Sequence, residues 1–255
     1  MSKLFPILLL ASAATLCAQF GPPPPAGPPR PAKATAPVDL TGYWVSVVTE
    51  DWRWRMVTPA KGDYTSVPLS QAGRKTADTW DPDKDTAAGN QCKAYGAAGL
   101  SRIPGRVHIT WEDDNTLKMD FDAGKQTRLF HFNAKMPANE AASLQGFSDA
   151  SWEGLRPVGR PGRGAPAPTP QGGSLKAVTT HLKPGYLRKN GIPYGADTEL
   201  TEYFDRTNEP NGDSWLVVTT IVHDPTNLYQ DFVTSTHFKM EKDGSKFDPQ
   251  PCEAK

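Results

Sequence analysis

Residues 106–121, RVHITWEDDNTLKMDF, indicate the fold of this chain most clearly. In both halves, Arg106–Glu112 and Thr116–Phe121, apolar and polar side chains alternate with the period of two that is typical of a strand with one buried face. The residues between them, Asp113-Asp114-Asn115, are turn formers, so the two halves are expected to form a β-hairpin. The side chains predicted to face the core are Val107, Ile109, Trp111, Leu117, Met119 and Phe121.

The rest of the folded region repeats this character, because short runs rich in β-branched and aromatic residues alternate with Gly, Asn, Asp and Pro. One segment, Ser70–Trp80, reads as a helix that Ser70 caps and Asp81-Pro82 ends. In Trp215–Val222 apolar side chains occupy both faces, which predicts a strand buried on both sides. The sequence thus predicts an all-β fold, an antiparallel barrel or sandwich with one short helix. The other expected strands are Tyr43–Thr49, Trp52–Val57, Thr127–Phe132, Leu175–Leu182, Thr198–Arg206, Trp215–His223 and Phe232–Met240.

The N-terminal residues have the character of an export signal. Lys3 precedes an apolar run, Leu4–Leu16, that is shorter than the roughly 20 residues of a membrane-spanning helix. We expect a signal peptide at residues 1–18 with cleavage after Ala18, the alternative being a lipid anchor at Cys17, and therefore a periplasmic or secreted protein. Residues 19–38 read as an extended proline-rich linker, and residues 39–255 as one domain with a disordered insertion at about 155–173.

Two cysteines, Cys92 and Cys252, remain after removal of such a signal peptide. In an oxidising compartment they are expected to form a disulfide, the alternative being two free thiols. Closure of so long a loop stabilises by roughly 4 to 5 kcal/mol in the chain-entropy description.

The composition argues against several partners. The chain carries 28 basic and 28 acidic residues, and no cluster of Lys and Arg on one element suggests a nucleic-acid partner. No second apolar run predicts a transmembrane segment. We expect a protein whose partner is a small molecule, and its oligomeric state stays open.

Two resemblances bear on the fold. Gly42-Tyr43-Trp44 is similar to the Gly-x-Trp signature in the first strand of lipocalin-like barrels, and Thr201-Glu202-Tyr203 loosely resembles that family's second motif. The resemblance implies an eight-stranded barrel whose tryptophan closes the base and whose mouth binds a small apolar ligand.

The second resemblance covers most of the chain from about residue 80 to residue 252, and it is to a group of uncharacterised secreted bacterial proteins. It implies export and a single β-rich domain, and it supplies no activity. The pieces that carry it are Gln91-Cys92, Gly99–Pro104, Gly146-Phe147-Ser148, Trp152-Glu153-Gly154, Leu200–Arg206 and Asp224-Pro225.

Enzyme chemistry has little support in the sequence. Neither Gly-x-Ser-x-Gly nor Ser-x-x-Lys occurs, and the five histidines lie on separate predicted strands, so neither a cofactor nor a metal is expected. The alternative is a hydrolase or isomerase in which Glu202, Tyr203 and His131 line a barrel wall for acid/base catalysis. The more ordinary interpretation of Glu202 is pairing with a base such as Arg206.

Two further segments bear on ligand recognition. Trp52–Met56, read as a strand, places two tryptophans on one face and Arg53 and Arg55 on the other, a pattern typical of an amphipathic strand that covers a core. The alternative is that the tryptophans stack on a sugar or an aromatic ligand while the arginines hold an anion from the opposite side. The basic loop Lys183–Gly191 is a surface loop or an anion contact.

The sequence therefore favours a secreted or periplasmic protein that binds a small apolar or amphipathic ligand, and an envelope-associated structural protein is a further alternative. The excess of tryptophans on predicted strands motivates this function. The predicted ligand-binding residues are Trp44, Trp54, Trp111, His131, Glu202 and Tyr203.

Overall fold

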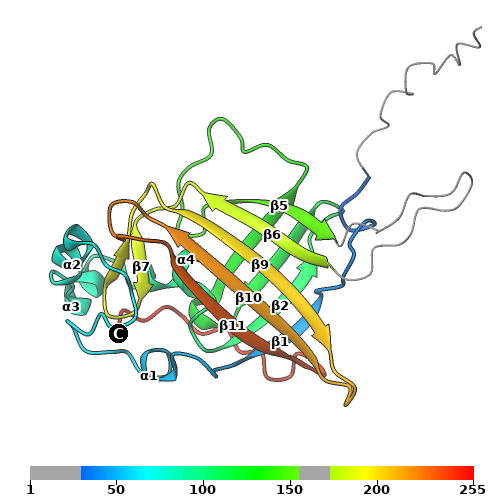
Figure 1. Ribbon diagram of the computed structural model, residues 1–255, viewed down its shortest axis with the longest axis horizontal. Helices are drawn as coiled ribbons and strands as arrows, with labels where there is room; N and C mark the ends of the chain where they lie inside the picture. Colours follow the sequence, from blue (N-terminus) through cyan, green and yellow to red (C-terminus); the bar gives the residue numbers. More distant parts are fainter. Residues whose placement is uncertain (1–29, 155–172) are drawn as a thin grey trace, which may run out of the picture.

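The computed structural model describes residues 30–154 and 173–255, and a closed barrel dominates it (Figure 1). The predicted signal peptide, the first part of the predicted linker and nearly all of the predicted insertion lie outside the described residues. The all-β barrel prediction is confirmed, with nine strands in the barrel rather than the eight that the lipocalin resemblance implies. The strands are β1 (Gly42–Val47), β2 (Arg106–Trp111), β3 (Thr116–Phe121), β4 (Gln126–Phe132), β5 (Phe147–Gly154), β6 (Gly173–Thr180), β9 (Glu199–Asn208), β10 (Ser214–His223) and β11 (Phe232–Glu241).

Strand pairing runs in the order β1-β11-β10-β9-β6-β5-β4-β3-β2 and closes from β2 back to β1. All pairs are antiparallel except β4 and β5, which run parallel with Phe130 opposite Ser148. Residues 133–146 carry the chain from the end of β4 back to the start of β5, a long return that a parallel pair requires and a hairpin does not. The barrel is therefore mixed, where the sequence predicted an antiparallel one.

The inside of the barrel is filled mainly by apolar side chains from alternating strand positions. Trp44 is fully buried and its indole N–H donates to the Leu40 carbonyl at 3.0 Å. Phe130 and Phe204 meet edge to face, with ring centroids 5.4 Å apart. The inward positions of β2 and β3 are those that the alternation predicted.

Helices and a small hairpin gather at one end of the barrel, on the left in Figure 1, and pack over a second apolar cluster. Ser70 caps α2 as predicted, since its hydroxyl accepts from the Gly73 N–H at 3.0 Å. Asp81 does not simply end that helix, because its carboxylate caps the next helix, α3. The prediction of a single helix is therefore wrong. These elements are α1 (Trp52–Arg55), α2 (Gln71–Ala77), α3 (Pro82–Ala87), η1 (Lys93–Tyr95), α4 (Ala97–Leu100), η2 (Ala123–Lys125), β7 (Gly185–Arg188) and β8 (Ile192–Tyr194). Within the described ranges, no helix is long and apolar enough to cross a membrane.

The predicted strand Trp52–Val57 is wrong, because this segment forms the short helix α1. The N–H groups of Trp54 and Arg55 donate to the Asp51 carbonyl, and none of the strands in the described part of the chain pairs with the segment. Helical geometry separates residues two apart by roughly 200° around the axis. The two tryptophans therefore do not share a face: Trp52 is 62% exposed, whereas Trp54 is half-buried.

Strand β10 is also less buried than predicted. Leu216, Val218 and Val222 are buried inside the barrel, but the outward positions, Trp215 and Val217 among them, are only half-buried. Much of the surface of a folded protein is apolar, so apolar side chains can lie on the outer face of a barrel strand without being buried. A strand with apolar residues on both faces is therefore not necessarily buried on both.

The predicted disulfide between Cys92 and Cys252 is confirmed, with Cα atoms 5.1 Å apart. It fastens the C-terminal segment to the chain just before η1. Next to the bond, the Gln250 N–H donates to the Asp122 carbonyl at 2.9 Å, so the tail lies along the barrel wall.

Candidate functional site

A pocket of about 270 Å³ lies between α1, α4 and β7 at the helical end of the barrel. Helix α1 lies below the barrel in Figure 1, and β7 lies beside the helices that gather at that end. Because these elements are far apart in sequence, only the folded chain forms the pocket. Its lining includes Trp54, Arg55, Met56, Val57, Ile103, Leu187 and Lys189, together with Arg102 and Arg188.

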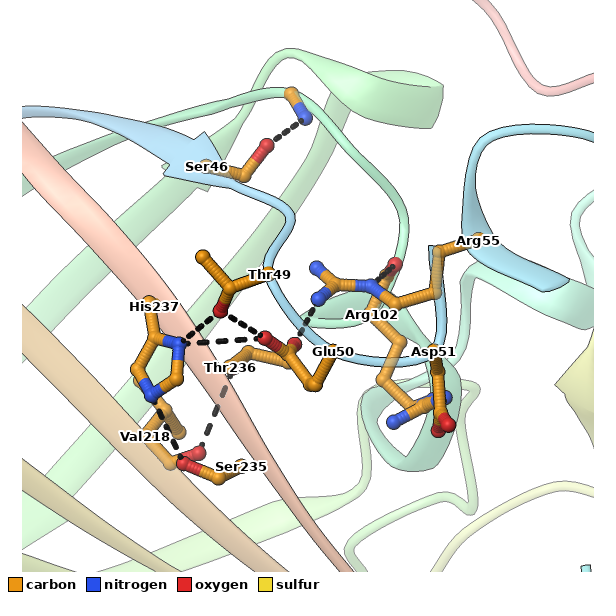
Figure 2. Close-up of polar contacts among 11 residues, drawn as sticks. Ser46, Thr49, Glu50, Asp51, Arg55, Arg102, Val218, Ser235, Thr236 and His237 are labelled. Carbon is orange, nitrogen blue, oxygen red and sulfur yellow. Dashed lines mark hydrogen bonds and ion pairs between the residues drawn. The ribbon is translucent and has the colours of Figure 1, made fainter. Parts of the chain in front are cut away.

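Three arginines, Arg55, Arg102 and Arg188, make the pocket cationic, and each is more than nine-tenths buried. Arg55 donates to the Arg102 carbonyl at 2.8 Å and forms an ion pair with Glu50 (Figure 2). Arg102 pairs with Asp51 at 2.7 Å. Among the described residues, the guanidinium of Arg188 donates only to neutral acceptors, the Thr65 carbonyl oxygen and the Ser66 hydroxyl oxygen, at 3.2 Å.

Arg55 and Arg102 pair directly with Glu50 and Asp51, whereas Arg188 has only the nearby charges of Asp51 and Asp63 within the described residues. Burial lowers the pKa of Arg188 to about 10, and the nearby charge of Arg102 contributes to the same shift. Burial also lowers the pKa of Arg55, and Glu50 opposes that shift. The causes are those expected when charged groups leave water and lie close to like charges. With a pKa of about 10, Arg188 stays protonated at neutral pH.

Two guanidinium nitrogens of this cluster have no hydrogen-bond partner within the described ranges: Nη2 of Arg55 and Nη1 of Arg102. A buried donor without an acceptor costs roughly 1 to 3 kcal/mol, and more when it is charged. Few unpaired groups of this kind persist in folded proteins without a reason. Both arginines line the pocket, so an anion that enters it would lie close to their guanidinium groups.

Exposed apolar side chains surround the cationic cluster. Met56 and Val57, which line the pocket, are 59% and 70% exposed, and Trp52 stands beside them on α1. Trp54 is anchored, since its indole N–H donates to Asp63 at 3.0 Å and the Arg188 guanidinium lies 5.4 Å from its ring centroid. The pocket thus combines a cationic base with an apolar rim.

The predicted tryptophan residues do not share one cavity. Trp44 is in the barrel core, and Trp111 is half-buried against Phe132 and Trp152 at the barrel end where the chain enters. Only Trp54 lines the arginine pocket, and it does so from a helix and not from the predicted strand.

The predicted acid/base group is also dispersed. Glu202 is fully buried inside the barrel, whereas Tyr203 and His131 occupy outward positions on β9 and β4. Neighbouring residues on a strand face opposite sides, so Glu202 and Tyr203 cannot line one cavity. His131 stacks on Phe147 at 4.8 Å, outside the barrel.

Glu202 is paired, as the ordinary interpretation held, but with Arg128 and not with Arg206. The two guanidinium nitrogens of Arg128 donate to the two Glu202 oxygens at 2.9 and 2.6 Å, and Arg128 also donates to Thr179. Arg206 instead lies 5.6 Å from the ring centroid of Trp44 and donates to the Asp39 carbonyl. The prediction failed because the partner lies 74 residues away in sequence.

Sequence reasoning found only part of the arginine pocket. An anion contact was one alternative for Arg55 and for the loop Lys183–Gly191, which contains Arg188, beside a core-covering strand and an ordinary surface loop, but Arg102 was missed. Its signal is weak: a single arginine follows the small and apolar residues 97–101. Within the described ranges, no group of three or more His, Cys, Asp or Glu residues is placed to hold a metal ion.

No family model, no curated protein and no solved structure matches this chain.

Proposed function

We propose that this protein binds a small amphipathic anion, a carboxylate attached to an apolar chain or ring, in the arginine pocket. The observation that carries the proposal is the gathering of three buried arginines, Arg55, Arg102 and Arg188, around one pocket with exposed apolar side chains at its edge.

The chemistry of the pocket supports a carboxylate. A guanidinium group presents paired N–H donors that match the two oxygens of a carboxylate, and such charge-assisted bonds are roughly twice as strong as neutral ones. The exposed side chains of Met56 and Val57 give the apolar part of the ligand a surface to cover. A small pocket with few polar groups on one side is typical of small-molecule sites.

The setting of this binding function belongs to the same proposal. The apolar run after Lys3 supports export to the periplasm or beyond, and the closed barrel is compatible with a lipocalin-like binding protein. Membership in the group of secreted β-rich proteins that the chain resembles is likewise proposed. In this proposal the ligand binds outside the barrel wall, where the sequence alone placed it inside.

The test compares octanoate with 1-octanol by isothermal titration calorimetry, because the two share an apolar chain and differ in charge. We expect octanoate to bind and octanol to bind at least tenfold more weakly. Replacement of Arg188 by Met removes one guanidinium without uncovering a paired carboxylate, so octanoate affinity is expected to fall about 10- to 100-fold, which corresponds to about 1.4 to 3 kcal/mol. Arg188→Lys is expected to recover only part of the loss, since it keeps the charge without the fork.

Arg53→Met is the matched control. Arg53 is exposed and lies on the same helix as Arg55, yet it does not line the pocket, so this variant should bind octanoate like the unmodified protein. Equal affinity for octanoate and octanol, or equal loss in the Arg53 and Arg188 variants, would contradict the proposal.

A further inference from the structure

A serine, a histidine and a glutamate lie in line on the outer wall of the barrel, next to the arginine pocket (Figure 2). The hydroxyl of Ser235 is 3.4 Å from Nε2 of His237, and the other ring nitrogen, Nδ1, is 3.2 Å from Oε2 of Glu50. Ser235 and His237 are two residues apart on β11, so they share its outer face. Glu50 comes from the segment that follows β1.

The hydrogen bonds around Thr49 fix the proton positions on the histidine. The Thr49 hydroxyl oxygen lies 2.8 Å from Glu50 Oε2 and 2.8 Å from His237 Nδ1. A carboxylate can only accept, so the single hydroxyl proton of Thr49 goes to Glu50. The Thr49 oxygen is then left to accept from Nδ1–H of His237.

A neutral imidazole with its proton on Nδ1 has a free lone pair on Nε2. Nε2 is the nitrogen that faces the Ser235 hydroxyl. Glu50 is itself held by Arg55, so the carboxylate that orients the ring has a fixed position. The chain of contacts has the order nucleophile, base and orienting acid that activates a serine.

We propose that Ser235 is an activated nucleophile that accepts an acyl group from a small ester, with His237 as its general base. The inference does not depend on the proposed anion binding, because Arg188 contacts none of these residues in the described structure while Ser235 does not line the pocket.

The reaction needs only the ester and water as reactants. The Ser235 oxygen bonds to the acyl carbon while its proton passes to His237 Nε2, and that proton then leaves with the alcohol as the ester C–O bond breaks. Water attacks the acyl-serine next, gives its proton to Nε2, and releases the carboxylic acid as Ser235 recovers its proton. The Ser–His distance of 3.4 Å is long, as is common for such pairs without a substrate.

The surroundings of Ser235 leave room for a substrate. Ser235 is half-buried, and its neighbour on the same face, Val233, is 59% exposed and offers an apolar contact for an acyl chain. Thr219 lies directly opposite Ser235 across the β10–β11 pair, on the same face. Side chains in such pairs are close enough for the Thr219 hydroxyl to reach the oxyanion that forms on the acyl group.

The experiment treats the protein with a fluorophosphonate, which traps activated serines as a stable adduct, and maps the adduct by peptide mass spectrometry. We expect a single adduct at Ser235, none in Ser235→Ala, and a labelling rate at least tenfold lower in His237→Gln. Thr49→Val should slow labelling by orienting the ring less well, and Thr49→Ser should restore it. Release of p-nitrophenolate from p-nitrophenyl acetate should follow the same order.

His223→Gln is the matched control, because His223 contacts Asp231 at 2.7 Å and no serine lies among its contacts in the described structure. Exposed imidazoles hydrolyse p-nitrophenyl acetate without any nucleophilic serine, and this variant measures that background. Circular dichroism confirms that each variant is folded. An adduct absent from Ser235, or a labelling rate that His237→Gln and His223→Gln change equally, would overturn the proposal.

Discussion

At the scale of single residues, the pairing of Arg128 with Glu202 is the strongest polar feature of the barrel interior. Both side chains are fully buried, and the guanidinium contacts both carboxylate oxygens. Removal of two charges from water is costly, and close pairing offsets that cost only when both partners are present. The pair therefore adds little net stability, but loss of either partner alone would leave a buried charge unpaired.

We predict that Arg128→Met lowers the free energy of unfolding by about 3 to 5 kcal/mol, because it leaves the Glu202 carboxylate buried without its partner. Arg128→Met combined with Glu202→Met should lose much less, since no charge then remains inside. Urea unfolding of the single and double variants measures both quantities.

The exposed pair of Lys176 and Glu153, 3.6 Å apart on neighbouring strands, provides the comparison. Its double alanine variant should change the free energy of unfolding by less than about 1 kcal/mol. If the double variant, Arg128→Met with Glu202→Met, is as unstable as Arg128→Met alone, the loss of stability does not come from the unpaired Glu202 charge.

At the scale of elements, Asp224 organises the connection between β10 and β11. Its carboxylate accepts from the backbone N–H groups of Gly195, Thr226 and Asn227 and from the Asn227 side chain, at 2.7 to 3.0 Å. Burial alone would raise the pKa of Asp224, but these hydrogen bonds outweigh burial and the pKa is lowered. The ionised Asp224 carboxylate therefore joins the β10–β11 connection to the loop that contains Gly195.

A carboxyl whose pKa is lower in the folded state stabilises the protein above its unfolded pKa of roughly 4, and the contribution is lost as the pH falls through the folded pKa. We predict that Asp224→Asn destabilises by about 1 to 3 kcal/mol at pH 7. The difference from the unmodified protein should be smaller at pH 3, because the carboxyl of the unfolded chain is then largely protonated and unfolding takes up a proton. Urea unfolding at the two pH values measures the change, and an equal difference at both would contradict it.

At the scale of the whole molecule, the disulfide joins the tail to the body across 160 residues of sequence. Beyond Cys252, the Glu253 N–H donates to the Tyr95 hydroxyl at 3.3 Å, and Gln250 donates to Asp122. The disulfide holds the C-terminal residues next to their partners, so these weak hydrogen bonds form readily.

We predict that Cys92→Ser combined with Cys252→Ser lowers the free energy of unfolding by about 4 to 5 kcal/mol, chiefly through the greater freedom of the unfolded chain. Reductant should destabilise the unmodified protein to a similar degree and leave the double variant unchanged, which is the control. Hydrogen exchange at Gln250 should quicken in the double variant. If reductant has no effect on the unmodified protein, the bond does not stabilise it.

The fold could be predicted in outline because strand character is local. Alternation of apolar and polar side chains in Arg106–Glu112 and Thr116–Phe121 is a property of neighbouring residues, and the structure places both hairpin strands as expected. The same reasoning failed at Trp52–Val57, where an equally regular alternation forms a helix. A strand needs a partner strand, and no local pattern tells whether one is present.

Strand β5 shows a second limit. Phe147–Gly154 contains no β-branched residue and was not predicted as a strand, yet it pairs with both β4 and β6. Its place in a closed barrel, with a neighbour on each side, outweighs its weak intrinsic preference. The parallel pairing with β4 likewise depends on the path of residues 133–146 and not on either strand.

The sequence by itself determined most of the segments that form barrel strands, which side chains of those strands face inward, and that Cys92 and Cys252 join. These features depend on local pattern and, for the cysteines, on a choice of one partner. Only the tertiary structure decided the partner of Glu202, the meeting of Arg55, Arg102 and Arg188, and the alignment of Ser235 with His237 and Glu50. Each of these brings together side chains from segments distant in sequence. Barrel closure sets which distant positions become neighbours, and no periodicity along the chain records that.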